Sequence, residues 1–109
     1  MPWLVRDAHV VASLEIADTR AARRVGLLGR DGIEGALLIQ PARSVHTMRM
    51  RFAIDVAHLD QDLTVISITR MSPWRLGVWR RRARAVLECE ADSLRAWGVA
   101  VGDQLEIRE

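Results

Sequence analysis

The sequence predicts a mainly β protein, a small antiparallel β sandwich or barrel with one helix and one short helical turn. Two observations lead to this prediction. Apolar and polar residues alternate with a period of two in several short runs, which is typical of half-buried strands. Turn-forming residues separate most of these runs, and only one long segment has helical spacing. The 109 residues fit a single domain, 1–109, because a second core would need a longer chain.

The N-terminal third is expected to form a strand and the main helix. Residues 8–16 alternate, with Val10 on the apolar face, which predicts a strand. Asp18 or Thr19 is expected to cap a helix over about residues 18–29. Four apolar residues at helical spacing are expected to face the core: Ala21, Ala22, Val25 and Leu28. The opposite arc is expected to be a solvated face: Arg20, Arg23 and Arg24.

The middle of the chain is expected to form strands. Residues 36–40 are a short apolar run, typical of a buried strand, and residues 44–53 alternate. One face of the second run carries His46, Met48, Met50 and Phe52. Two further strands, 54–59 and 63–69, are expected to form a hairpin through a turn at residues 60–62.

The C-terminal third is expected to hold two strands separated by a helical turn. Residues 84–91 alternate, with Cys89 on the inward face and Glu88 on the outward face. A short helical turn is expected over about residues 92–97, and a last strand over residues 104–108.

The composition excludes several classes of protein. All 16 basic residues are arginine, and the absence of lysine excludes Schiff-base catalysis and P-loop phosphate binding. The single cysteine, Cys89, excludes an internal disulfide. No apolar run approaches the roughly 20 residues that a membrane span requires. We therefore expect a cytoplasmic protein with no membrane span and no cofactor.

Seven segments resemble, in order, the motifs of an uncharacterised family of bacterial and archaeal proteins. These segments are 26–30, 35–39, 45–47, 50–56 with 59–60, 73–75, 83–88 and 102–103. Over roughly residues 14–107 the chain is therefore similar to the family catalogued as domain of unknown function 192. The resemblance implies a mainly β fold, and it implies no activity because the family has none assigned.

The chain departs from the pattern of this family at three positions. Ala53 stands where the family usually has proline, and His58 stands where an aromatic residue is common. Leu63 stands where the family usually has glycine. Because a bulky residue disfavours a positive φ, we expect the hairpin at Leu63 to use another turn type.

The best candidate for a binding pocket centres on residues 46–55. The candidate pocket residues are His46, Thr47, Arg51, Asp55, Arg30, Arg84 and Glu88. In the functional interpretation, Arg51 pairs with an anion, and His46 and Asp55 form hydrogen bonds or exchange protons. In the structural interpretation, which we favour, His46 is a core histidine. Asp55 then forms an ion pair with Arg51, Arg30 or Arg84 that fixes strand register.

A second candidate is a basic loop in which tryptophan and arginine alternate. Its candidate anion-binding residues are Trp74, Arg75, Trp79, Arg80, Arg81 and Arg82. This composition suits single-stranded nucleic acid, an anionic lipid surface or an acidic partner. We favour a solvated hairpin, and regard nucleic acid as the weaker candidate partner, because the net charge is only +2.

Metal and thiol chemistry are not predicted. The three histidines lie far apart in the sequence, and a closed zinc site needs about four convergent ligands. Cys89 lies on the apolar face of its run, where cysteine usually acts as a small hydrophobic residue.

The sequence therefore favours a non-catalytic accessory module that binds a small molecule or a peptide. Two alternatives remain open. One is an enzyme that uses His46, Thr47, Arg51 and Asp55 on an anionic or carbohydrate-like substrate. The other is an adaptor that docks on an anionic surface through the basic loop.

Overall fold

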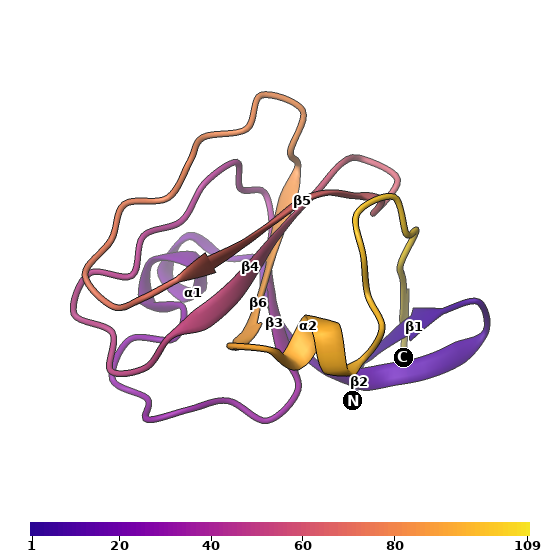
Figure 1. The fold of residues 1–109 in the computed structure, drawn as a ribbon, viewed down its shortest axis with the longest axis horizontal. Coiled ribbons are helices and arrows are strands. Elements are labelled where there is room, and N and C mark those ends of the chain that lie inside the picture. The colour runs from indigo at the N-terminus through magenta and orange to yellow at the C-terminus, as the bar shows by residue number, and fades with distance from the viewer.

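A computed structural model describes all 109 residues and confirms a mainly β fold (Figure 1). Seven strands and two short helices follow one another along the chain. In order they are β1 (Trp3–Arg6), β2 (His9–Ala17), α1 (Arg20–Val25), β3 (Ala36–Ile39), β4 (Ile54–Leu59), β5 (Val65–Met71), β6 (Ala85–Glu90), α2 (Ser93–Ala96) and β7 (Glu106–Arg108). The strand β1 was not predicted, and the other strands lie close to predicted runs.

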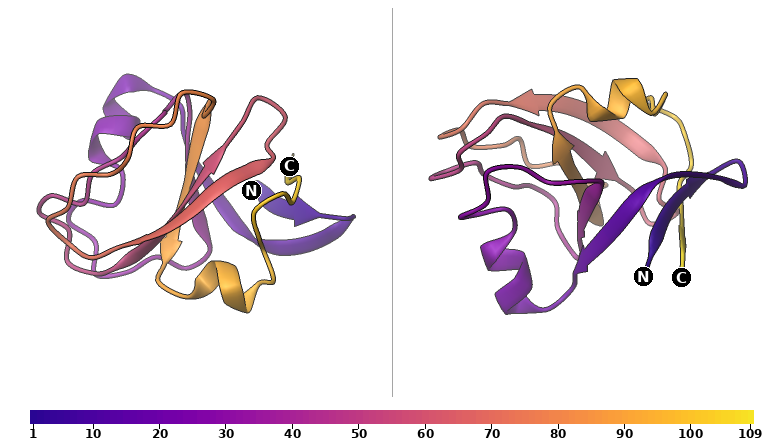
Figure 2. Two further views of the ribbon diagram at one scale, coloured as in Figure 1. Left: turned by 45° about the horizontal axis from the view of Figure 1, so that its top comes forward. Right: turned by 90° about the horizontal axis from the view of Figure 1, so that it is seen from below.

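The strands form one sheet in the order β5-β4-β6-β3-β2-β1-β7. All neighbours are antiparallel except β2 and β3, which are parallel. The parallel pair arises because α1 and the loop after it form a crossover between β2 and β3, and parallel neighbours require such a connection. Figure 2 shows the sheet curling on itself. The sheet is not closed, although Val65 N donates to Asp103 O at 2.8 Å across the gap.

Two apolar cores lie on opposite faces of this sheet. The first fills the inside of the curl and includes Leu38, Leu87 and Leu94. The second lies beneath α1 and includes Leu27 and Val56. Because β3, β4 and β6 contribute to both cores, their residues are buried on both faces, with the sole exception of the last residue of β6. Glu88 on β6 is therefore buried, and the expected outward position was wrong.

Three other expected side-chain positions were also wrong. Val10 in β2 is exposed, because the register between β1 and β2 shifts between Leu4 and Val5 and the period of two is interrupted there. Ala21 and Val25 in α1 are exposed, and α1 has no buried residue. The helix does begin as expected, since the hydroxyl of Thr19 accepts a hydrogen bond from Ala22 N at 3.1 Å.

Residues 44–53 form no strand of the sheet, which corrects the prediction for this run. Instead, residues 40–53 and 72–84 run alongside each other as an irregular ribbon, here called the arm, which contacts the second core. Gly77 N donates to Val45 O at 2.9 Å, and Arg80 N donates to Arg43 O at 3.0 Å. A Cβ atom at Gly77 would collide with Val45 O, so this close approach requires glycine.

The hairpin between β4 and β5 forms where it was expected, but its turn corrects one prediction. Leu63 adopts φ of 62°, so the left-handed position is kept despite the bulky side chain. Asp60 stabilises the turn, because its Oδ1 accepts hydrogen bonds from Asp62 N at 2.9 Å and Thr64 N at 3.0 Å.

Candidate functional site

A cavity of about 250 Å³ lies between α1, the sheet and the arm. Half of its 14 lining residues are hydrophobic, and these include Leu27, Ile39 and Met50. Its polar side chains come from three separate elements: Arg23 and Arg24 from α1, Ser44 and His46 from the arm, and Glu88 from β6. A concave site in which apolar residues and convergent polar groups meet can hold a small molecule, and this cavity combines both kinds of residue.

Glu88 lies on the sheet face that this cavity covers. Its neighbours across the strands are Leu37 on β3 and Val56 on β4, and both belong to the second core. Only 3% of Glu88 is exposed, and no hydrogen bond or ion pair satisfies its carboxyl group. Every polar side-chain atom that is fully buried in the protein has a hydrogen-bond partner. Because the carboxyl group of Glu88 has none, its oxygen atoms are not fully enclosed, and they open onto the cavity.

Burial raises the pKa of Glu88 from its usual value of 4.5 to about 7. The cause is the loss of solvation, which disfavours the charged form. The carboxyl group is therefore about half protonated near neutral pH. It can donate a hydrogen bond when neutral and accept one when charged.

Gly26 places the end of α1 directly above this carboxyl group. The residue has φ of 49°, and a Cβ atom there would lie 3.8 Å from Glu88 Oε1. A larger residue would therefore be strained in its backbone and would fill the space above the acid. The motif that begins at Gly26 thus shapes the cavity as well as ending the helix.

His46 lines the cavity and is exposed, so the expected core position was wrong. Its Nδ1 lies 3.2 Å from Met48 N, which donates a hydrogen bond to it. Since Nδ1 accepts, a neutral ring carries its proton on Nε2. Of the seven candidate pocket residues, the structure brings only His46 and Glu88 to one cavity.

Thr47 is fully buried inside the arm and takes no part in the cavity. Its hydroxyl donates to Ser72 O at 2.6 Å and accepts from Arg75 N at 2.9 Å. Its backbone bonds the same segment, because Thr47 N donates to Arg75 O at 2.8 Å and Trp74 N donates to Thr47 O at 2.8 Å. Thr47 therefore holds the two segments of the arm together.

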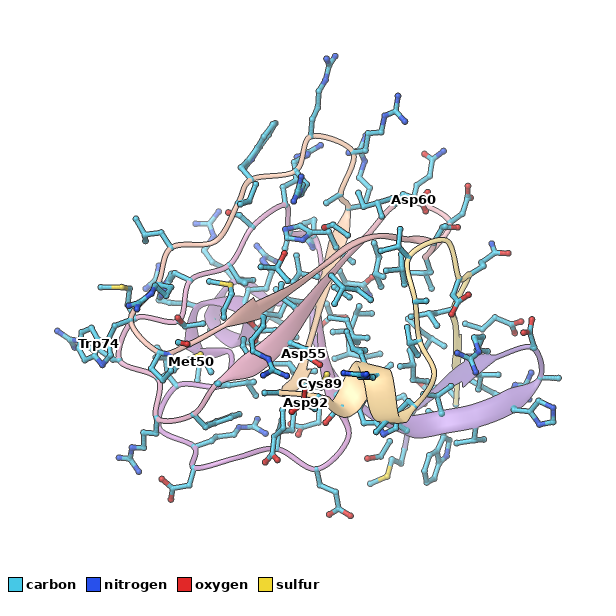
Figure 3. All side chains as sticks on the ribbon, in the orientation of Figure 1. Met50, Asp55, Asp60, Trp74, Cys89 and Asp92 are labelled. Atoms are coloured by element: carbon cyan, nitrogen blue, oxygen red, sulfur yellow. The ribbon has the colours of Figure 1, made fainter.

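Asp55 lies on the other face of the sheet, beside α2 (Figure 3). Its Oδ2 accepts a hydrogen bond from Leu94 N at 3.4 Å, and its Oδ1 is 3.9 Å from Arg70 Nε. Arg70 also pairs with Asp92. The ion pair of Asp55 is therefore made with Arg70, and the partners considered from the sequence were wrong. Asp55 connects β4, β5 and α2.

The three remaining pocket candidates lie elsewhere on the surface. Arg51 pairs with Asp31 at 3.1 Å, and Arg30 forms a two-pronged pair with Glu15 at 2.8 and 2.9 Å. That pairing lowers the pKa of Glu15 through the hydrogen bond from Arg30. Arg84 donates to two backbone carbonyl groups of its own loop.

His58 is a buried histidine that sequence reasoning treated only as a departure from a family pattern. Its Nε2 lies 3.1 Å from Val78 O, and Ser67 Oγ lies 3.1 Å from its Nδ1. Burial lowers the pKa of His58, so the neutral ring is favoured, with Nε2 donating to Val78. This contact ties the arm to the sheet.

Cys89 is buried in the first core, as expected, beside Ala85 and Leu87. Burial is the main cause that raises the pKa of its thiol to about 12, and the charge of Asp55 adds to the shift. The thiol therefore stays protonated near neutral pH and is a poor nucleophile.

No group of three or more histidine, cysteine, aspartate or glutamate residues converges on a point that could hold a metal ion. No helix is long and apolar enough to cross a membrane.

Sequence reasoning missed Arg23 and Arg24 as cavity residues. Their arc of the helix was expected to be a solvated face; Arg24 is exposed and Arg23 is half-buried, and both also line the cavity. The sequence of the helix alone does not reveal this role. Arg23 and Arg24 reach the cavity because the crossover from β2 to β3 places α1 over β6.

The comparisons with known proteins identify the family. The family model of domain of unknown function 192, described as "Uncharacterized ACR", matches residues 4–107. A UPF0127 protein of Pyrococcus furiosus is 34% identical over 108 residues, covering 94% of this chain and 93% of that protein. A UPF0127 protein of Pyrococcus abyssi is 32% identical over 98 residues, covering 85% and 84% of the two chains.

Two solved structures share the fold. A protein of unknown function from Novosphingobium aromaticivorans has a TM-score of 0.80 at 21% identity, over 96% of this chain and 82% of that chain. A protein described as a putative transcription regulator from Sinorhizobium meliloti has the same score and identity, over 96% and 90%. At this identity the likeness shows the fold alone. With the family model matching nearly its whole length, the chain belongs to the DUF192 family, for which no function is established.

Proposed function

We propose that the protein is a non-catalytic module that binds a small organic molecule in the cavity beneath α1. The observation that carries this proposal is the carboxyl group of Glu88, which is 3% exposed and has no partner within the protein. Because this group opens onto the cavity, a ligand there can form a hydrogen bond with it. Such a hydrogen bond contributes roughly 0.5–3 kcal/mol, and the larger values apply where one partner is charged.

The charges around the cavity indicate the chemistry of the ligand. Arg23 and Arg24 line the cavity, and neither forms an ion pair with an acidic side chain. Their charge disfavours a cation and favours an anion. The neutral form of Glu88 donates a hydrogen bond, which suits a carbonyl or carboxylate oxygen. The proposed ligand is therefore a small organic anion with such an acceptor.

The experiment measures binding of a panel of small carboxylates and phosphate esters by thermal shift, followed by calorimetry on each hit. A ligand present at about 100 times its Kd stabilises the protein by roughly 2.7 kcal/mol. Glu88→Leu keeps the bulk and removes the hydrogen bond, so the affinity is expected to fall by roughly tenfold or more. Glu106→Gln, on the exposed strand β7, is the matched control and leaves the affinity unchanged.

The pH dependence of binding gives a second, independent readout. If neutral Glu88 donates to the ligand, the affinity falls as the pH rises through about 7, where the acid loses its proton. Glu88→Gln always carries a donor, so its affinity is expected not to vary over that interval. A hit that Glu88→Leu leaves unchanged, or a panel without any hit, would contradict the proposal.

A second candidate function, acid–base catalysis, is favoured by one observation. His46 and Glu88 line the same cavity, and a carboxyl group whose pKa is about 7 suits a general acid or base. The two functions are distinguished by whether the bound ligand is chemically converted. Turnover of a hit, followed by NMR and abolished in Glu88→Gln while binding persists, would replace the binding module with an enzyme.

A further inference from the structure

The charge of the protein is divided unevenly between the arm and the rest of the chain. The arm, residues 40–53 and 72–84, contains half of the 16 basic residues and no acidic residue. Its arginines are Arg43, Arg49, Arg51, Arg75, Arg80, Arg81, Arg82 and Arg84. The other 8 basic and all 14 acidic residues leave the rest of the chain with a net charge of −6. The overall charge of +2 therefore conceals a strongly basic arm.

Half of these arginines form a side-chain hydrogen bond within the protein, and the other half form none: Arg49, Arg80, Arg81 and Arg82. Only Arg51 forms an ion pair, with Asp31. Arg80, Arg81 and Arg82 are exposed, consecutive, and without a carboxylate partner. A cluster of cations that form no ion pair creates a local positive potential that attracts anionic surfaces.

The arm also carries half of the ten large apolar side chains that the protein exposes. These are Met48, Trp74, Leu76, Val78 and Trp79. The exposed fraction is 81% for Leu76, 61% for Trp79 and 56% for Trp74. Trp74 points outward at the edge of the molecule (Figure 3). A concentration of exposed apolar side chains usually marks an interaction surface.

The arm is ordered by its own hydrogen bonds before any partner arrives. Thr47 bonds to Ser72 and Arg75 across the ribbon, and the ring of His58 holds Val78 against the sheet. Because these bonds already fix the backbone, the arm loses little conformational entropy on docking. Figure 1 shows the segment between β5 and β6 running along an outer edge, away from both termini.

The mixture of side chains distinguishes a lipid surface from a nucleic acid. Single-stranded nucleic acid gains from tryptophan and arginine, through stacking and phosphate contacts. Exposed Leu76 and Val78 contribute nothing to stacking, but they gain free energy on entering the apolar zone of a bilayer. Tryptophan at the membrane–water interface and arginine on anionic headgroups complete a surface typical of peripheral membrane proteins.

We propose that the arm docks the protein on an anionic lipid bilayer. Trp74, Leu76 and Trp79 enter the interface, and the arginines of the arm contact the lipid phosphates. Docking of this kind is reversible and needs no membrane-spanning helix.

The experiment is co-flotation of the full chain with vesicles. One set contains phosphatidylglycerol and phosphatidylcholine in equal parts, and the other contains phosphatidylcholine alone. We expect binding to the anionic set that weakens as salt is added, because screening reduces the attraction between arginines and headgroups. Arg80→Gln with Arg81→Gln is expected to weaken binding on the order of 30-fold, since each arginine near the surface contributes roughly fivefold.

The apolar contribution is tested with Leu76→Ser and Trp79→Ser together. We expect roughly tenfold weaker binding or more, from the loss of buried apolar area. The matched controls change exposed residues of the same kind outside the arm. They are Val10→Ser with Val101→Ser for the apolar pair, and Arg20→Gln with Arg95→Gln for the charged pair. Both controls are expected to bind like the wild type.

Three outcomes would overturn the proposal. Equal binding to neutral and anionic vesicles would remove the role of the arginines. Controls that weaken binding as much as the arm variants would show that the arm is not the docking surface. Absence of vesicle binding, together with salt-sensitive binding of a single-stranded oligonucleotide, would assign the arm to nucleic acid instead.

Discussion

Thr47 shows how a single polar side chain can hold two segments of the structure together without taking part in a functional site. It was proposed as a pocket residue because residues 46–55 bring an imidazole, a hydroxyl, a guanidinium and a carboxylate close together in the sequence. In the structure its hydroxyl is buried and hydrogen-bonded to Ser72 O and Arg75 N. The hydroxyl group of Thr47 therefore holds the two segments of the arm together, while the neighbouring His46 lines the cavity.

Replacement of Thr47 by valine should weaken the arm. The change preserves the shape of the side chain and leaves two backbone groups, Ser72 O and Arg75 N, without this partner. We expect a loss of about 1–3 kcal/mol in the free energy of unfolding, measured by urea denaturation. Thr47→Ser keeps the hydroxyl and should lose less. If both variants lost the same amount, the methyl group rather than the hydroxyl would be responsible.

At the scale of elements, the period of two located strands but could not assign them to the sheet. Residues 54–59 were predicted and form β4, because alternation there coincides with pairing on both sides. Residues 44–53 alternate equally well but pair with the loop at residues 72–80. Alternation reports an extended backbone with two different faces, and it does not identify the partner of that backbone.

The hairpin between β4 and β5 depends on one carboxylate. Asp60 Oδ1 accepts two backbone hydrogen bonds in a turn where Leu63 has a positive φ. Asp60→Ala is therefore expected to lower the free energy of unfolding by about 1–2 kcal/mol, measured by thermal or urea denaturation. Asp62→Ala, in the same turn, removes a carboxylate that forms no hydrogen bond and serves as the control. Equal losses in the two variants would argue against this role for Asp60.

At the scale of the whole molecule, the cavity could be predicted only in part. Glu88 and His46 were among the candidates because acids and histidines stand out against an apolar background. Arg23 and Arg24 were not, because only the parallel pairing of β2 with β3 places α1 over β6. A site assembled by a crossover depends on long-range topology, which no local pattern in the sequence contains.

The free energy of unfolding of the whole molecule should depend on pH through the titration of Glu88. Its pKa is about 7 when folded and near its usual 4.5 when unfolded, so the folded state binds more protons between those values. The contribution of Glu88 is therefore most favourable below pH 4.5 and is lost as the pH rises to about 7, by about 3 kcal/mol.

Glu88→Gln isolates this effect because glutamine does not titrate. The difference in the free energy of unfolding between the variant and the wild type should grow in favour of the variant from below pH 4.5 to above pH 7. Urea denaturation at several pH values measures this difference. The contributions of other titrating groups, such as His58, are the same in both proteins and cancel in the difference. A difference that stays constant with pH would mean that Glu88 titrates normally.

The pairing of β1 with β7 brings the first and last strands together, with Trp3 opposite Arg108. Figure 2 shows the two termini close to each other. A short linker could therefore join them, and the chain could be reopened at the exposed turn between β1 and β2, at Asp7 and Ala8. The resulting circular permutant would begin with β2 and end with β1, and it would preserve every strand neighbour, the cavity and the arm.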